Sequence, residues 1–124
     1  QISANEQIEV SIRFRDPNVP NESGNDPTVK RLDLIVGHVR GPVTDPNTDT
    51  NETTRVVERF TEGEWVRDGE LVTVKTTLPA IEQDAYIRVR GTSGHDVEPV
   101  MDTVGEDPWA DLWFYSNPVF IDVR

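Results

Sequence analysis

The sequence predicts an all-β fold, an antiparallel β-sandwich of about seven short strands in a single domain over residues 1–124. Apolar and polar residues alternate with a period of two along several short segments, which is typical of strands that bury one face. Clusters of Pro, Gly, Asn and Asp separate these segments and indicate turns. No long segment repeats its apolar residues with the period of an α-helix, and no internal repeat is found.

The first two strands are separated by a long loop. At residues 8–14, apolar side chains alternate with Glu, Ser and Arg, which predicts a strand with one buried and one solvated face. Residues 16–27 are almost all turn formers. A second strand is expected over 32–36, where Ile35 breaks the alternation and indicates burial on both faces. Gly41-Pro42 and the polar stretch after it end this strand.

A hairpin is expected in the middle of the chain. The pattern indicates a strand over residues 53–60, followed by Gly63 and Trp65. Residues 67–70 contain an Asp-Gly pair, which favours the tight turn of a β-hairpin. The return strand is expected over 71–78 and ends at a proline.

The last third holds two more strands and one short helical turn. Residues 85–91 alternate again and predict a strand, and the polar stretch 92–107 predicts a loop. Residues 108–113 begin with proline after Asp107, which is typical of a capped helical turn. The final strand is expected over 117–123.

One local pattern, around Tyr86, is typical of a particular class of β-sandwich. Leu78-Pro79 precedes Tyr86, which opens the alternating stretch that follows. In immunoglobulin-like and fibronectin III-like sandwiches, a tyrosine near the start of the sixth strand bonds back to the backbone a few residues upstream. We therefore expect Leu78 and Tyr86 to form a structural tyrosine corner. The alternative is that Tyr86 is a ring on which a ligand stacks.

The charge balance restricts the partners. Twelve Lys and Arg face 23 Asp and Glu, so the net charge is −11. Such a surface repels phosphate backbones and anionic lipids, which disfavours nucleic-acid and membrane-surface partners. No apolar run is long enough for membrane insertion. Only two basic residues are lysines, and the scarcity of lysine with excess acid favours a halophilic source over an ordinary acidic extracellular domain.

The residues available for catalysis are few. There is no cysteine, which excludes thiol catalysis, disulfides and iron–sulfur clusters. The only histidines, His38 and His95, lie far apart in the sequence. No metal-binding, nucleophile-elbow or phosphate-loop motif occurs. We expect no catalytic residue, no metal ligand set and no cofactor.

Two acidic segments leave cation binding open. Residues 45–52 place oxygen side chains at alternating positions, as at the start of a calcium loop. The sixth position is Thr50 instead of Gly and the twelfth is Val56 instead of Glu, so a soluble turn explains the segment as well. The second segment is a solvated loop or a cation site, with the acids Asp96, Glu98, Asp102, Glu106, Asp107 and Asp111.

The densest apolar feature is an aromatic segment that contains Trp109, Trp113, Phe114 and Tyr115. Buried, these rings would close one end of the sandwich. Exposed, they would form a docking surface for a partner domain or stack on carbohydrate.

Four segments in this order resemble one type of domain. Residues 10–15, 31–37, 86–92 and 111–120 are similar to the C-terminal β-domain of bacterial and archaeal phosphoesterases. These enzymes carry a metal-dependent catalytic domain of the polymerase-and-histidinol-phosphatase (PHP) type. The resemblance implies that the metal ligands belong to the upstream catalytic domain, and no position of this chain matches them. The start at Gln1 and the single methionine, Met101, favour a fragment or a processed product, and the resemblance implies the C-terminal part of a phosphoesterase.

The expected function follows. We expect a non-catalytic accessory domain that packs on or positions its own upstream phosphoesterase domain, with the last strand and the aromatic segment as docking edge. The main alternative is a carbohydrate- or cell-surface-binding module that uses Trp109, Trp113 and Tyr115 as platforms. A third is that the chain is itself hydrolytic. An extracytoplasmic or cell-surface location is expected over a cytoplasmic one.

Overall fold

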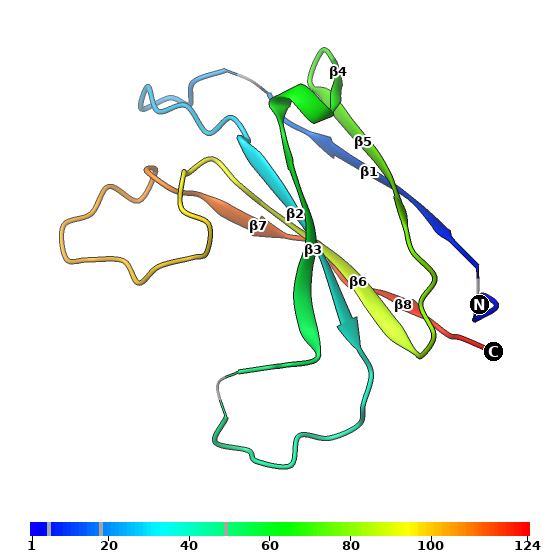
Figure 1. The fold of residues 1–124 in the computed structure, drawn as a ribbon. Helices are drawn as coiled ribbons and strands as arrows, with labels where there is room; N and C mark the ends of the chain where they lie inside the picture. Colours follow the sequence, from blue (N-terminus) through cyan, green and yellow to red (C-terminus); the bar gives the residue numbers. More distant parts are fainter. Residues whose placement is uncertain (5, 18, 49) are drawn as a thin grey trace.

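The segments in which apolar and polar residues alternate form strands in the structure. In the computed structural model, which describes residues 1–4, 6–17, 19–48 and 50–124, eight strands form two antiparallel sheets with one 3-10 helix, Glu62–Glu64, between strands (Figure 1). The predicted all-β sandwich is confirmed. No helix among these residues is long and apolar enough to cross a membrane.

The first sheet has three strands in the order β1-β5-β4. β1 (Ile8–Arg15) and β5 (Leu71–Leu78) pair antiparallel along their full length. The predicted Asp-Gly turn joins β5 to the short β4 (Val66–Asp68), which pairs with the first three residues of β5, whereas the strand expected over 53–60 lies in the other sheet. Gly69 in the turn has a φ of 59°, a conformation that glycine adopts without strain.

The second sheet carries the longer surface. β2 (Arg31–His38) lies between β3 (Thr54–Thr61) and β6 (Ala85–Thr92). On the far edge of β6, β7 (Trp113–Tyr115) pairs with residues 90–92 and β8 (Val119–Ile121) with residues 85–87. β7 and β8 therefore lie at opposite ends of β6, as Figure 1 shows.

The strand order is that of an immunoglobulin-like sandwich. β1, β5 and β4 take the places of strands B, E and D, and β2, β6 and β7–β8 those of C, F and G, with β3 in the additional C′ place. Ile2 pairs in parallel with Val123, so the two ends of the chain lie side by side next to β8 (Figure 1).

The core lies between the sheets. Its fully buried side chains come from the centres of both, with Leu32 and Leu34 on β2 and Val72 and Val74 on β5. The predicted burial of β2 on both faces is confirmed, because its six central residues are all buried. Trp65 closes one end with its ring edge-on to Phe14, at a centroid distance of 6.2 Å.

The prediction of a helical turn over residues 108–113 is wrong. Asp107 does cap a turn, since its side chain accepts from the Trp109 N–H (3.0 Å) and its carbonyl from the Ala110 N–H (3.0 Å). The chain does not continue as a helix, because pairing with the end of β6 draws Trp113–Tyr115 into β7. The last strand, predicted over 117–123, is β8, and β7 is an additional strand before it; the total is eight where about seven were expected.

Candidate docking surface

The outer face of the second sheet is built around one buried carboxylate. Asp33 is 1% exposed, although it lies between the core residues Leu32 and Leu34 on β2 and therefore faces away from the core. In the sheet register it lies opposite Arg59 on β3 and Arg90 on β6. Its oxygens lie 2.7 Å from Nε of Arg90, 3.1 Å from Nε of Arg31 and 3.4 Å from Nε of Arg59. Three guanidinium groups thus compensate one charge that would be costly to bury alone.

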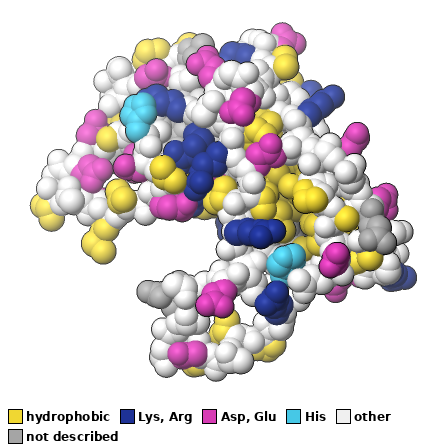
Figure 2. All heavy atoms as spheres, in the orientation of Figure 1, with side chains coloured by type: hydrophobic (Ala, Val, Ile, Leu, Met, Phe, Trp, Pro, Cys, Tyr) yellow, Lys and Arg dark blue, Asp and Glu magenta, His cyan; other side chains and the backbone are white. Residues whose placement is uncertain are grey.

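The same arginines hold the long loop 93–112. Nη2 of Arg31 donates to the carbonyls of Asp96 (2.6 Å) and Val97 (3.1 Å). Glu98 reaches back to the sheet, with its carboxylate 2.6 Å from Nη1 of Arg90 and 2.9 Å from Nη2 of Arg59. In Figure 2, Lys and Arg side chains cluster over β2, β6 and β7 with acidic side chains around them.

These contacts shift two ionisations. The bond to Arg90 is the main reason why the pKa of Glu98 is lowered, and the charges of Arg90, Arg59 and Arg31 add to it. The pKa of Arg90 is raised by its bond to Glu98 and then by Asp33, against the cost of burial. Both groups therefore stay charged, which keeps the ion pairs between loop and sheet intact.

The four aromatic residues expected to form one docking surface point in different directions. Trp113 and Tyr115 lie on the outer face, where Arg90 is 5.2 Å from the Trp113 ring centroid and Arg88 is 5.1 Å from that of Tyr115. Phe114 points inward and lies against Phe14, with ring centroids 6.0 Å apart.

Trp109 sits in loop 93–112 and is 41% exposed. β7 thus divides the aromatic segment between the two faces of the sheet, because alternate residues of a strand point to opposite sides.

Apolar exposure is greatest on β8. Phe120 is 72% exposed and Val119 is 65% exposed, whereas Ile121 is buried in the core. The Phe120 ring lies edge-on to Tyr86 at a centroid distance of 6.3 Å. Val119 and Phe120 were not among the residues singled out in the sequence, although the last strand was expected to belong to a docking edge.

The hydrogen bond that the described residues show for the Tyr86 hydroxyl runs across the sheet, not to the backbone upstream. This hydroxyl lies 2.7 Å from the hydroxyl of Thr54 on β3. Gly37 stands between the two residues in the sheet register, and a Cβ there would fall 2.2 Å from the Tyr86 ring. The ring therefore crosses β2 on the outer face and bonds across the sheet, while Leu78 is buried in the core on the other side.

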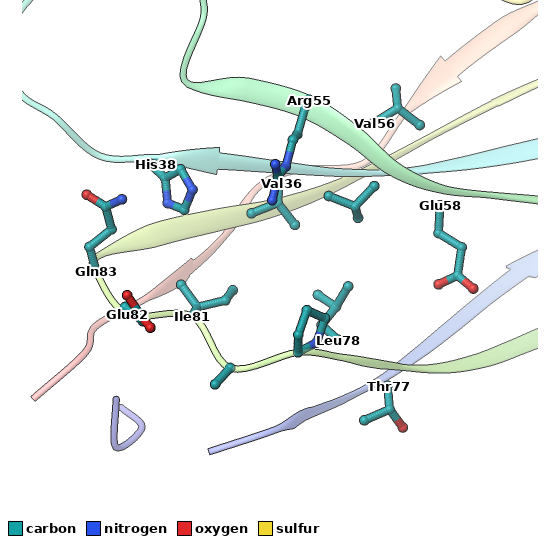
Figure 3. A pocket seen from close by; sticks show the side chains of 13 residues that line it. Val36, His38, Arg55, Val56, Glu58, Thr77, Leu78, Ile81, Glu82 and Gln83 are labelled. Carbon is teal, nitrogen blue, oxygen red and sulfur yellow. The ribbon is translucent and has the colours of Figure 1, made fainter. Parts of the chain in front are cut away.

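A groove of about 590 Å³ opens along the side of the sandwich between β3 and the segment 77–83 (Figure 3). Val36, Leu78 and Ile81 form its apolar lining. His38 and Gln83 stand at one end, and Glu58 stands toward the other (Figure 3).

The polar groups of this groove do not form a reactive pair. The Glu58 carboxylate accepts a hydrogen bond from the Thr76 hydroxyl at 2.7 Å, which joins the two sheets. Nδ1 of His38 is buried and has no hydrogen-bond partner among the described residues.

The two acidic segments show local hydrogen bonding. Asp45 accepts from the backbone N–H of Asn47 (2.9 Å), and Asp49 lies outside the described residues. In the second segment, Glu106 accepts from Thr103 and Asp111 from the Trp113 indole. Among the described residues, no three or more His, Asp or Glu side chains form a group suited to a metal ion.

Sequence reasoning missed Asp33 and its arginines. The available signal was one charged residue inside each of three strands, at a position that alternates with apolar residues: Asp33, Arg59 and Arg90.

A comparison with family models, curated proteins and solved structures finds no match to this chain.

Proposed function

We propose that this chain is a non-catalytic accessory module that packs against an upstream metal-dependent phosphoesterase domain and positions it. β8 is the contact edge in this proposal. The nature of the upstream domain rests on the sequence resemblance alone, whereas the choice of contact edge rests on exposure and on where the chain begins.

The observation that carries the proposal is the exposed apolar surface of β8 beside the start of the chain. Phe120 and Val119 are 72% and 65% exposed. Ile2 pairs with Val123, two residues beyond β8, so a domain joined at Gln1 would begin next to this surface. A few central aromatic anchors contribute most of the binding energy of such an interface. The tether also raises the local concentration of the partner.

The carbohydrate-binding alternative has less support. Arg31 and Arg90 lie 5.6 and 5.2 Å from the ring centroid of Trp113, and Arg88 covers Tyr115. These contacts occupy ring surface on which a sugar would stack. Trp109 lies in loop 93–112, outside the strands of the sheet that carries these two rings.

Replacement of Phe120 by Asp in the full-length gene product tests the proposal. An aromatic anchor contributes about 2 kcal/mol to such a contact. The apparent unfolding temperature of the upstream domain should therefore fall by roughly 4–8 °C, and its phosphoesterase activity should change. Scanning calorimetry and hydrolysis of a generic phosphoester measure the two effects.

Val66→Asp is the matched control, because Val66 is an apolar strand residue as exposed as Phe120 (71% against 72%) but lies on β4 of the other sheet. This variant should leave both readouts unchanged. Equal behaviour of Phe120→Asp and Val66→Asp would contradict β8 as the contact edge.

A further inference from the structure

The outer end of loop 93–112 exposes a run of large apolar side chains. Met101 is 91% exposed, Val104 is fully exposed, and Val97 and Val100 are more than half exposed. Single exposed apolar residues are ordinary, but four within eight positions are typical of an interaction surface.

Their spacing matches one face of an α-helix. Val97, Val100, Met101 and Val104 stand at positions i, i+3, i+4 and i+7. Figure 1 shows the segment as an irregular loop, and the described residues 97–104 contain no helix. In the free protein the four apolar side chains therefore do not form the helix face that their spacing would allow.

The ends of the segment also carry helix signals. Asp96 precedes it, which is a favoured N-cap residue. Pro99 would fall in the first turn, where its missing N–H has no helical partner in any case. Gly105 follows with a φ of 88°, the left-handed conformation that commonly ends a helix.

An isolated two-turn helix is not stable in water, because nucleation costs more than so few hydrogen bonds return. The apolar face of a partner would supply the missing stabilisation. The sheet keeps the segment in place for this, since Arg31 and Arg90 hold the carbonyl of Val97 at 3.1 and 3.2 Å.

Charge defines the partner. Loop 93–112 contains six acids and no Lys or Arg. Glu98 is neutralised by arginines of the sheet, but among the described residues the side chains of the other five acids form no ion pair with Lys or Arg. In Figure 2, hydrophobic and acidic side chains gather where Figure 1 places this loop. A surface of this charge repels anionic lipid and attracts basic protein.

The position of the loop separates this surface from β8. The loop continues from the Thr92 end of β6, whereas β8 pairs at the Ala85 end, beside the chain termini (Figure 1). A partner on the loop would leave β8 free, so this inference does not depend on the proposed function.

We propose that residues 97–104 fold into a two-turn helix on binding and insert Val97, Val100, Met101 and Val104 into an apolar groove of a partner protein, with Lys and Arg along the rim of that groove. This is the helix-in-groove mode of recognition, which uses anchors at i, i+3, i+4 and i+7.

A photo-reactive methionine at Met101 in the full-length gene product, made in its own cells, tests the proposal. The cross-linked protein is purified and its affinity for the unlabelled gene product is measured. Val100→Ser with Met101→Ser should weaken binding at least tenfold, whereas Val66→Ser on β4 should not. Thr103→Pro keeps every apolar and charged side chain but breaks a helix, and it should also weaken binding at least tenfold.

Three results would overturn the proposal. The first is the absence of any protein cross-linked at Met101. The second is equal affinity of the Val100→Ser, Met101→Ser double variant and the Val66→Ser control. The third is unchanged binding by Thr103→Pro, which would mean that the segment binds without forming a helix. All variants lie on exposed side chains, and unchanged unfolding temperatures confirm that each is folded.

Discussion

Replacement of Asp33 by Asn should destabilise the protein by about 3 to 5 kcal/mol, the usual cost of breaking a buried ion pair by removing one partner. The substitution keeps the shape of the side chain but removes the charge that Arg31 and Arg90 share, and both guanidinium groups are mostly buried. Urea unfolding of the 124-residue chain measures the change.

The sign of this effect is informative. The chain has a net charge of −11, so removing one negative charge weakens the repulsion among the acids. If this long-range effect acted alone, the substitution would stabilise the protein slightly. Glu70→Gln is the matched control, because Glu70 makes only an exposed ion pair with Arg15 at 3.7 Å and should change stability by about 0.5 kcal/mol or less. Equal effects of the two substitutions would show that Asp33 is not the centre of the outer face.

Replacement of Gly91 by Ala should also destabilise the protein, by about 1 to 3 kcal/mol. Alanine is normally at least as favourable as glycine in a strand. At this position, however, the added Cβ would lie 2.3 Å from the Phe114 ring and 2.9 Å from Cδ2 of the buried Leu32. The ring or the strand must move, and thermal unfolding measures the cost.

A double-mutant cycle locates the cause of this loss. Phe114→Leu removes the ring that the new methyl group meets, so the cost of Gly91→Ala should fall by about 1 kcal/mol in that background. Gly63→Ala is the control, because a Cβ there meets nothing within 4 Å. Additive effects of Gly91→Ala and Phe114→Leu would contradict the close contact between β6 and the inward face of β7.

The fold class was predictable because strand patterns are local. The alternation along 8–14 and the apolar run 34–36 within β2 each depend on neighbouring residues only. Strand β7 was not predictable in this way. Trp113–Tyr115 follow a capped turn, and only the pairing with residues 90–92 of β6, about twenty positions earlier, makes them a strand.

The candidate surface was harder to predict, because it depends on register. Alternation correctly places Asp33 on the outer face, and a charged residue there normally meets water. Arg59 and Arg90 become its partners because β3 and β6 pair with β2 at that residue. Tyr86 shows the same limit. Its sequence context predicts a local corner bond, but Gly37 opens a path across β2 to Thr54.

Amide hydrogen exchange at β8 tests the proposed docking role most directly. Exchange at residues 119–121 is compared between the full-length gene product and the 124-residue chain alone. If β8 is the docked edge, its amides should exchange at least tenfold more slowly in the full-length protein. The exchange rates on β4 should be the same in both proteins and serve as an internal reference. Identical exchange rates at β8 in the two proteins would contradict a role for this edge in holding an upstream domain.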